Sequence, residues 1–239
     1  MLVTNFKLKA FLYGIVCAGY QVLDVGRIHP MRERSLRALD RTVDYIEKNM
    51  PDALGFESQR ELIDFALRQV KIDGHYLEFG VFTGGTMRYM AKRVPGHVFH
   101  GFDSFEGLPE AWSGFYIGDR GFDVKKRLPR VPHNVRLHRG WFDESLPKWL
   151  EQNPGPVAFT HLDCDIYSST RTVLTLLAGR IVPGTLILFD EYFNYPNWEK
   201  HEYQAFQEFV AENQVKYCYL AFARQQVAVL IESTRTGQA

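Results

Sequence analysis

A chain of 239 residues with 46% apolar and 23% charged residues has a globular balance, which excludes disordered, collagen-like and coiled-coil chains. Its 28 basic residues match its 28 acidic ones, so it lacks the basic excess typical of proteins that bind nucleic acid, and no such partner is expected. Its three cysteines, Cys17, Cys164 and Cys218, fit neither a disulfide framework nor a zinc site. Reduced thiols and a cytoplasmic location are therefore expected.

The first 56 residues are expected to form an N-terminal arm followed by a helical preface. Residues 10–23 are mostly apolar but fall short of the roughly 20 residues that span a bilayer, so no stable membrane insertion is expected, and a signal peptide is the less favoured alternative. The stretch is expected to pack on the domain or on a second subunit, as in a homodimer. A helix is predicted over 34–49 and another over 57–71. The first has apolar residues at helical spacing: Leu36, Leu39, Val43 and Ile46.

Residues 57–239 are expected to form one domain in which strands and helices alternate. Short apolar runs predict strands over 75–80, 97–102, 135–139, 157–163 and 185–190. Helices are predicted between them at about 85–93, 121–128, 143–152 and 168–179. Continuous apolar strands separated by helices are typical of a parallel sheet with helices on both faces.

The order of elements changes after residue 190. A helix predicted at about 201–213 is followed by strands over 215–222 and 226–232, and the short link between these strands makes them antiparallel neighbours. Five parallel strands and a terminal antiparallel hairpin make an α/β fold. The pattern predicts the Rossmann-like class I methyltransferase fold, a seven-stranded, mostly parallel sheet with a C-terminal antiparallel hairpin.

Ligands of open α/β sheets bind at the carboxyl ends of the strands, and the first of these ends leads into a glycine-rich turn, residues 78–86. Gly80 permits a tight turn, and the following glycines, Gly84 and Gly85, allow a ligand to approach a helix N-terminus. Phe82 occupies the place of the middle glycine in the dinucleotide fingerprint, which disfavours NAD and FAD. Glu78 suits a ligand ammonium group. The alternative is a plain strand-turn-helix connection.

Asp103 ends the second strand, 23 residues after Gly80, close to the offset of roughly 20 residues expected for an acid that binds ribose hydroxyls. The alternative is a solvated loop acid. After the third strand, Gly140, Trp141 and Phe142 are candidates to flank an adenine, or else to cap the core. A nucleoside-type cofactor is therefore expected.

Four acids follow the fourth and fifth strands: Asp163, Asp165, Asp190 and Glu191. Adjacent parallel strands bring these acids together, and such a concentration of charge is costly unless a cation, a proton or a substrate ammonium offsets it. Oxygen ligands suit Mg²⁺ or Ca²⁺. The alternative is that one or two of the acids are helix N-caps.

Four segments, LEFGVFTGGTMRYMA, FDSFEGLP, HLDCDIYSSTRTVL and FDEYFNYPNW, together resemble the macrocin O-methyltransferase (TylF-like) family of S-adenosylmethionine (SAM) methyltransferases over residues 57–232. The resemblance implies that the glycine-rich turn binds the methionine half of SAM and that Asp103 holds the ribose. The cofactor-binding residues that it implies are Glu78, Gly80, Gly84, Gly85, Thr86, Asp103, Ser104 and Phe105. The full predicted cofactor set also includes Phe79, Val81, Gly140, Trp141, Phe142 and Asp163.

The same resemblance implies a Mg²⁺ ion held by Asp163, Asp190 and Glu191, and Asp165 as the general base. Glu191 departs from the Asp or Asn that is common in the family. His161 and His201 are alternative bases, and His201 follows an aromatic segment at 192–203. That segment and residues 112–116 are expected to cover the acceptor.

The predicted function is transfer of a methyl group from SAM to a hydroxyl of a small molecule, a sugar or phenol of a natural product, with assistance from Mg²⁺. One alternative is a SAM methyltransferase with an amine or lipid-linked acceptor. The other is a SAM-binding protein without turnover, which would have no use for four clustered acids.

Overall fold

A computed structural model describes residues 30–112 and 122–234 of the chain. The apolar stretch 10–23, Cys17 and most of the expected 112–116 cover lie outside the described residues.

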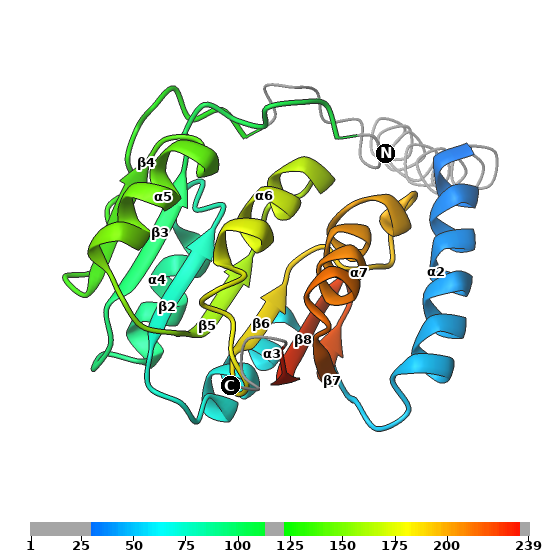
Figure 1. Ribbon diagram of the computed structural model, residues 1–239. Coiled ribbons are helices and arrows are strands. Elements are labelled where there is room, and N and C mark those ends of the chain that lie inside the picture. The colour runs from blue at the N-terminus through cyan, green and yellow to red at the C-terminus, as the bar shows by residue number, and fades with distance from the viewer. Residues whose placement is uncertain (1–29, 113–121, 235–239) are drawn as a thin grey trace, which may run out of the picture.

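The described residues form one eight-stranded sheet (Figure 1). Its strands are β1 Leu54–Phe56, β2 His75–Phe79, β3 Phe99–Asp103, β4 Val135–Arg139, β5 Val157–Leu162, β6 Leu186–Phe189, β7 Lys216–Ala223 and β8 Gln226–Ser233. The order across the sheet is β1-β7-β8-β6-β5-β2-β3-β4, and only β8 runs antiparallel to its neighbours. The predicted parallel sheet and its C-terminal hairpin are therefore confirmed. β1 is an eighth strand that was not predicted, and it places three residues of the expected preface in the sheet, beside β7.

Helices cover both faces of the sheet, as predicted. They are α2 Pro30–Asn49, α3 Gln59–Gln69, α4 Gly85–Arg93, α5 Phe142–Gln152, α6 Tyr167–Leu177 and α7 Glu202–Asn213, with the 3-10 turn η1 Trp198–Lys200 before α7. Buried side chains of α5, α6 and α7 pack with one half of the core, and those of α3 and α4 pack with the other half. Among the described residues no helix has both the length and the apolar character needed to cross a membrane.

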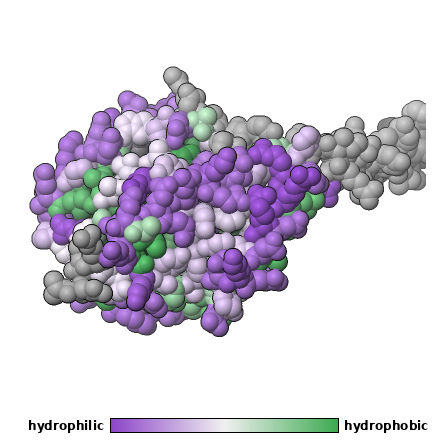
Figure 2. All heavy atoms as spheres, turned by 45° about the vertical axis from the view of Figure 1, so that its right-hand side comes forward, coloured by the Kyte–Doolittle hydropathy of each residue, from purple (hydrophilic) through white to green (hydrophobic). Residues whose placement is uncertain are grey.

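Helix α2 confirms the predicted helix but buries a different face. Ala38 and Thr42 are its buried residues, whereas Leu36, Leu39 and Val43 are 47%, 43% and 44% exposed. The helix is attached to the domain by the packing of Ala38 and Ile46 on the core and by polar contacts, such as the bond of 2.5 Å between the hydroxyls of Tyr45 and Tyr219. On the face shown in Figure 2, toward which the α2 side is turned, hydrophobic residues form small patches in a mainly hydrophilic surface.

The helix predicted at about 121–128 is wrong for the residues that are described. Residues 122–128 form turns, and Phe122, Lys125 and Lys126 have φ angles of 68°, 53° and 61°. The Asp123 carboxylate accepts a hydrogen bond from the Lys125 amide at 2.6 Å, and the Phe105 carbonyl accepts one from the Lys126 amide at 2.8 Å. These bonds compete with those of a helix, as Asp side chains commonly do in turns.

Candidate active site

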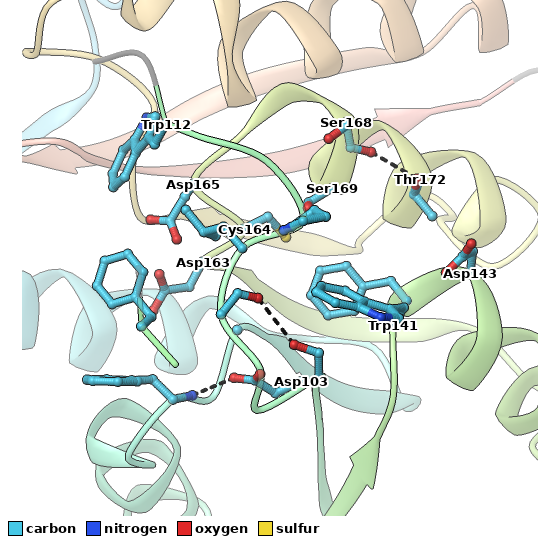
Figure 3. Close-up of a pocket in the computed structure, with 18 of the residues that line it drawn as sticks. Asp103, Trp112, Trp141, Asp143, Asp163, Cys164, Asp165, Ser168, Ser169 and Thr172 are labelled. Carbon is cyan, nitrogen blue, oxygen red and sulfur yellow. Dashed lines mark hydrogen bonds between the residues drawn. The ribbon is translucent and has the colours of Figure 1, made fainter. Parts of the chain in front are cut away.

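The carboxyl ends of β2, β3, β5 and β6 border a pocket with a volume of about 630 Å³ (Figure 3). This volume lies within the range of roughly 300–1,000 Å³ that is usual for small-molecule sites. Among the residues that line it are Gly80, Asp103, Ser104, Trp141, Phe142, Asp163, Asp165, Asp190 and Glu191. The pocket thus joins part of the predicted cofactor set to all four predicted acids.

Gly80 brings the turn after β2 against the loop after β5. Its φ angle is +93°, and a Cβ atom at this position would lie 1.8 Å from the carbonyl oxygen of Asp163. The Asp163 amide donates to the Phe79 carbonyl at 2.9 Å, which holds the two segments together. Glycine is therefore required here by both conformation and space.

Replacing Gly80 by Ala is expected to destabilise the fold by at least about 3 kcal/mol, because the new methyl group meets backbone and the residue keeps a strained φ angle. Urea unfolding measures the effect. Gly85→Ala is the control, since nothing lies within 4 Å of the position that its Cβ atom would take, and it is expected to be neutral or to stabilise by up to about 1 kcal/mol. Equal stability of the two variants would contradict this account of Gly80.

Several predicted cofactor residues have side chains that belong to the core. Phe79 and Phe105 are fully buried, Val81 is 5% exposed, and the Phe79 ring stacks on Phe102 with centroids 4.9 Å apart. Any cofactor contact from these three positions would come from the backbone. The pocket lining does not include Glu78, Gly84, Gly85, Thr86 or Gly140.

Asp103 ties the glycine-rich turn to β3. One carboxylate oxygen, Oδ2, accepts hydrogen bonds from the amides of Val81 and Phe82 at 2.8 and 2.6 Å, and Oδ1 accepts one from the Phe105 amide at 2.6 Å. A carboxylate offers about four acceptor positions. One position therefore remains for a further hydrogen bond, and a ligand contact through both oxygens requires one of these bonds to be exchanged.

Aromatic side chains form much of the pocket wall: Phe82, Trp112, Phe122, Trp141 and Phe142. Trp112 is 4% exposed and meets Tyr195 edge to face at 5.8 Å. Trp112 belongs to the segment 112–116 and Tyr195 to the segment 192–203, so the two segments expected to cover an acceptor contact each other through these rings.

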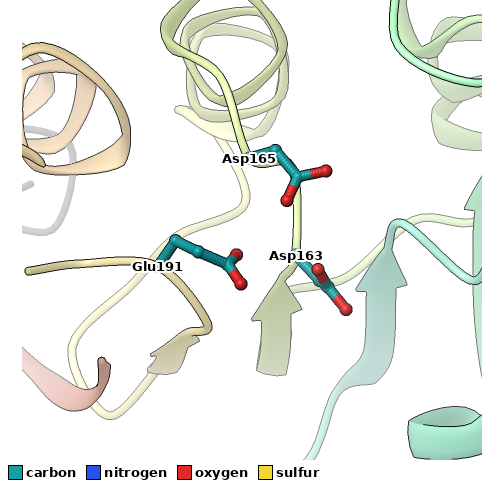
Figure 4. Close-up of side chains that lie close together, drawn as sticks. All are labelled: Asp163, Asp165 and Glu191. Carbon is teal, nitrogen blue, oxygen red and sulfur yellow. The ribbon is translucent and has the colours of Figure 1, made fainter. Parts of the chain in front are cut away.

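Three carboxylates gather at the ends of β5 and β6. Asp163, Asp165 and Glu191 each place an oxygen so that all three lie within 4.8 Å of one another (Figure 4). Glu191 is 9% exposed, and its Oε2 atom has no hydrogen-bond partner among the described residues. We call these three residues the acid trio.

Burial raises the pKa of every carboxyl group in the acid trio well above its ordinary value, and neighbouring charges raise it further. For Asp163 the next causes are the charges of Asp190 and Asp165. For Asp165 they are those of Glu202 and Asp190. For Glu191 they are those of Asp190 and Asp163. Protons or a cation would offset this repulsion.

Asp190 was predicted as a metal ligand, but the structure groups Asp165 with Asp163 and Glu191 in its place. The Oδ1 atom of Asp190 contacts the side-chain amide of Gln59 and the Nε2 atom of His161, the latter at 3.2 Å, and a side-chain hydrogen bond also joins Asp190 to Glu191. A ligand role for Asp190 stays a prediction. Burial favours the neutral form of Asp190, but the hydrogen bond and charge of His161 outweigh it and lower the pKa. His161 pairs with Leu188 in the register of β5 and β6, and alternate residues of a strand share one face of the sheet. Asp190 comes two residues after Leu188, so its side chain lies on the same face as His161.

His161 links Asp190 to Glu78 across β2, β5 and β6. It is fully buried, and its Nδ1 atom lies 3.1 Å from Glu78 Oε1. Burial alone would lower its pKa, but hydrogen bonds to Asp190 and Glu78 raise it well above the ordinary value. Both ring nitrogens are engaged and the ring does not line the pocket, which argues against His161 as the base.

His201, the other predicted alternative base, lies directly before α7. It is 7% exposed, its ring centroid is 6.0 Å from that of Tyr195, and burial lowers its pKa. The described pocket lining does not include it. A catalytic role for His201 therefore stays a prediction.

Glu202, the first residue of α7, is a site residue that the sequence did not indicate. It is fully buried, Oε1 accepts a hydrogen bond from the Cys164 amide at 3.0 Å, and Oε2 accepts one from the Glu191 amide at 3.1 Å. Burial raises the pKa of Glu202 to about 8 despite these bonds. An acid in the first turn of a helix is usually solvated and favoured by the helix dipole, so its type and position gave no signal.

Comparison with known proteins adds a family match. Residues 77–192 match the model of a family described as a methyltransferase domain. A tetracenomycin-C rhamnosyl 4'-O-methyltransferase from Streptomyces olivaceus is 30% identical over 51% of this chain and 54% of its own length. Demethyldecarbamoylnovobiocin O-methyltransferase from Streptomyces niveus is 26% identical over 52% of this chain and 55% of its own. The chain thus spans about half the length of these relatives.

Solved structures extend the likeness to most of the chain. The calicheamicin methyltransferase CalS11 superposes with a TM-score of 0.61 over 85% of this chain and 93% of its own, at 22% identity. The O-methyltransferase NovP gives 0.55 over 73% and 79%, also at 22% identity. At this identity the likeness shows the fold. Residues 77–192 therefore match a methyltransferase domain, and the chain has the fold of class I methyltransferases.

Proposed function

We propose that the chain is a SAM-dependent O-methyltransferase of the macrocin (TylF-like) type that methylates a hydroxyl of a small natural product, with a sugar hydroxyl as the favoured acceptor. The observation that carries the proposal is the pocket that joins Asp103 and Gly80 to the acid trio. The methyltransferase match supports the reaction, and the names of the two relatives, one of which includes a rhamnosyl group, support the acceptor class.

The pocket suits SAM, which supplies an activated methyl group when bound. Asp103 would accept a hydrogen bond from a ribose hydroxyl at its remaining acceptor position. The rings of Trp141 and Phe142 line the same pocket and would pack against the adenine. Gly80 lines the pocket with its backbone, where the methionine half would lie. Such positioning is the main task of the protein, since the reacting groups must meet in line.

The acid trio suits a hard divalent cation such as Mg²⁺, because its donors are oxygens and Glu191 Oε2 lacks a partner among the described residues. Asp163 and Glu191 would hold the ion, which would lower the pKa of an acceptor hydroxyl beside it. Asp165 would accept the proton of that hydroxyl, and its raised pKa makes it a better base near neutral pH than an ordinary carboxylate. The aromatic walls would exclude water from the reacting groups.

Two other functions are weaker. A SAM-binding protein without turnover would gain nothing from three carboxylates held this close together, which cost stability. An amine or lipid-linked acceptor is the remaining alternative, and it is separated from a hydroxyl acceptor by the atom that becomes methylated.

The test is incubation of the purified protein with methyl-labelled SAM, Mg²⁺ and a panel of glycosylated aromatic natural products and simple phenols and amines. Label on a hydroxyl oxygen of a sugar or phenol, located by mass spectrometry and NMR, is the expected result. Label found only on nitrogen, or binding of SAM without transfer to any member of the panel, would count against the proposal.

Replacing Asp103 by Asn is expected to weaken binding of the demethylated cofactor by about 1.5–3 kcal/mol, because a charged hydrogen-bond acceptor is lost and the turn amides lose part of their anchor. Isothermal calorimetry measures the change. Asp123→Asn is the control, since Asp123 lies on a neighbouring loop outside this pocket lining. Equal affinity of wild type and Asp103→Asn would remove Asp103 from the cofactor site.

A further inference from the structure

Glu202 joins the two loops that carry the acid trio. Its carboxylate accepts one hydrogen bond from the amide of Cys164, which lies between Asp163 and Asp165, and another from the amide of Glu191 itself. One side chain, fully buried at the start of α7, thus contacts the backbone on both sides of the cluster.

The backbone ladder between β5 and β6 stops just before these loops. Its final contact is the hydrogen bond of 2.9 Å from the Asp190 amide to the Leu162 carbonyl. Beyond it, no backbone hydrogen bond joins residues 163–165 to residue 191 in the part of the chain that the structure describes. Beyond the end of the sheet ladder, the two hydrogen bonds to Glu202 therefore hold the loop after β5 and the loop after β6 at a fixed distance.

The choice of a glutamate fits this task. Two backbone N–H groups need two acceptor oxygens, which a carboxyl group retains in both protonation states, whereas the NH₂ group of a glutamine can only donate. Burial of another acid beside the trio is costly, so a helix start with no further role would be better served by a neutral side chain.

We propose that Glu202 is a positioning residue, which fixes the distance between the Asp163–Asp165 loop and Glu191 and thereby sets the affinity of the site for a divalent cation. This inference rests on the proposed function, because it assigns a role to Glu202 in the same cation site. Residues that orient metal ligands from outside commonly change metal affinity by about 10- to 100-fold when they are replaced.

The test is Glu202→Gln in the full chain, with Mn²⁺ as the probe. Binding of Mn²⁺ is measured by electron paramagnetic resonance, binding of the demethylated cofactor by calorimetry, and stability by thermal unfolding. The dissociation constant for Mn²⁺ is expected to rise about 10- to 100-fold. Affinity for the cofactor product is expected to stay within about threefold, since its expected contacts lie on other loops, and a purely structural role would not produce this split.

Glu212→Gln is the matched control. Glu212 lies on the same helix and accepts hydrogen bonds from Arg171 of α6 at 2.6 and 2.7 Å, so the control also loses a contact between elements. It is expected to leave Mn²⁺ affinity unchanged. Glu202→Asp keeps both acceptors on a shorter arm and is expected to give an intermediate affinity, and it carries the test if Glu202→Gln does not fold.

The outcomes separate the two proposals. A wild type that binds Mn²⁺ while Glu202→Gln binds it equally well would overturn the positioning role alone. A wild type that binds no Mn²⁺, with or without the cofactor product, would overturn the cation site and the positioning role together.

Discussion

Replacing Asp165 by Asn is expected to slow methyl transfer by about 10²- to 10⁴-fold, the usual contribution of a general base. Asp165 lines the pocket, and burial with the charges of Glu202 and Asp190 raises its pKa, so its carboxylate is a competent proton acceptor. The rate is measured under single-turnover conditions with an acceptor that the wild type methylates. Cation affinity is measured on the same preparation and is expected to fall by less than about tenfold.

Asp123→Asn, outside the lining of the main pocket, is the control for this change of acid to amide. Because Asp165 is close enough to Asp163 and Glu191 to serve as a ligand, the two measurements decide between its roles. Loss of the cation together with activity would make Asp165 a ligand. Full activity would exclude it as the base and return His201 to consideration.

Removal of divalent cations is expected to reduce methyl transfer by at least about 10²-fold, since a Lewis acid contributes several kcal/mol and each 1.36 kcal/mol is tenfold in rate. Binding of the cofactor product is expected to change little. Asp163→Asn should reproduce the effect of the chelator. The comparison with Asp190→Asn tests the ligand set, because Asp190 contacts His161 and Gln59 and is not a member of the trio. An equal loss of cation in both variants would favour the set predicted from sequence, and full activity in excess chelator would exclude the cation.

The raised carboxyl pKa values also predict how the stabilisation of the protein by a bound cation changes with pH. A folded state with raised carboxyl pKa values binds protons more tightly than the unfolded chain, so these groups lower stability as pH rises from the unfolded pKa of about 4. A cation binds their ionised form. Thermal stabilisation by Mg²⁺ is therefore expected to be larger at about pH 8 than at about pH 5 in the wild type, and absent in Asp163→Asn. Equal stabilisation at both pH values would place the cation elsewhere.

The order of strands and helices was predictable because buried strands and amphipathic helices have different apolar periods. β1 escaped prediction because it has three residues, of which Leu54 is exposed. The turns at 122–128 escaped because local and long-range bonds of Asp123 and Phe105 replace those of a helix. In α2, spacing predicted the helix but not its orientation, which polar contacts of Tyr45 and Arg41 help to set.

The site was predictable as a set of strand ends, but not in its detailed contacts. Sequence placed Asp163, Asp165, Asp190 and Glu191 at one edge, and the pocket includes all four. The alternation of side chains along a strand was a usable signal for His161. Its side chain lies on the same face as that of Glu78, its partner in the register of β2 and β5. Glu202 had no such signal, because its contacts depend on how α7 begins against two loops far away in the chain.

The eight-stranded sheet ends in β1 on one side and β4 on the other. β1 has three residues, and β4 bears the exposed side chains of Arg136 and Arg139. Short or positively charged edge strands are poor templates for addition of a further strand from another molecule. In the part of the chain that the structure describes, both margins of the sheet are thus poor sites for edge-to-edge aggregation.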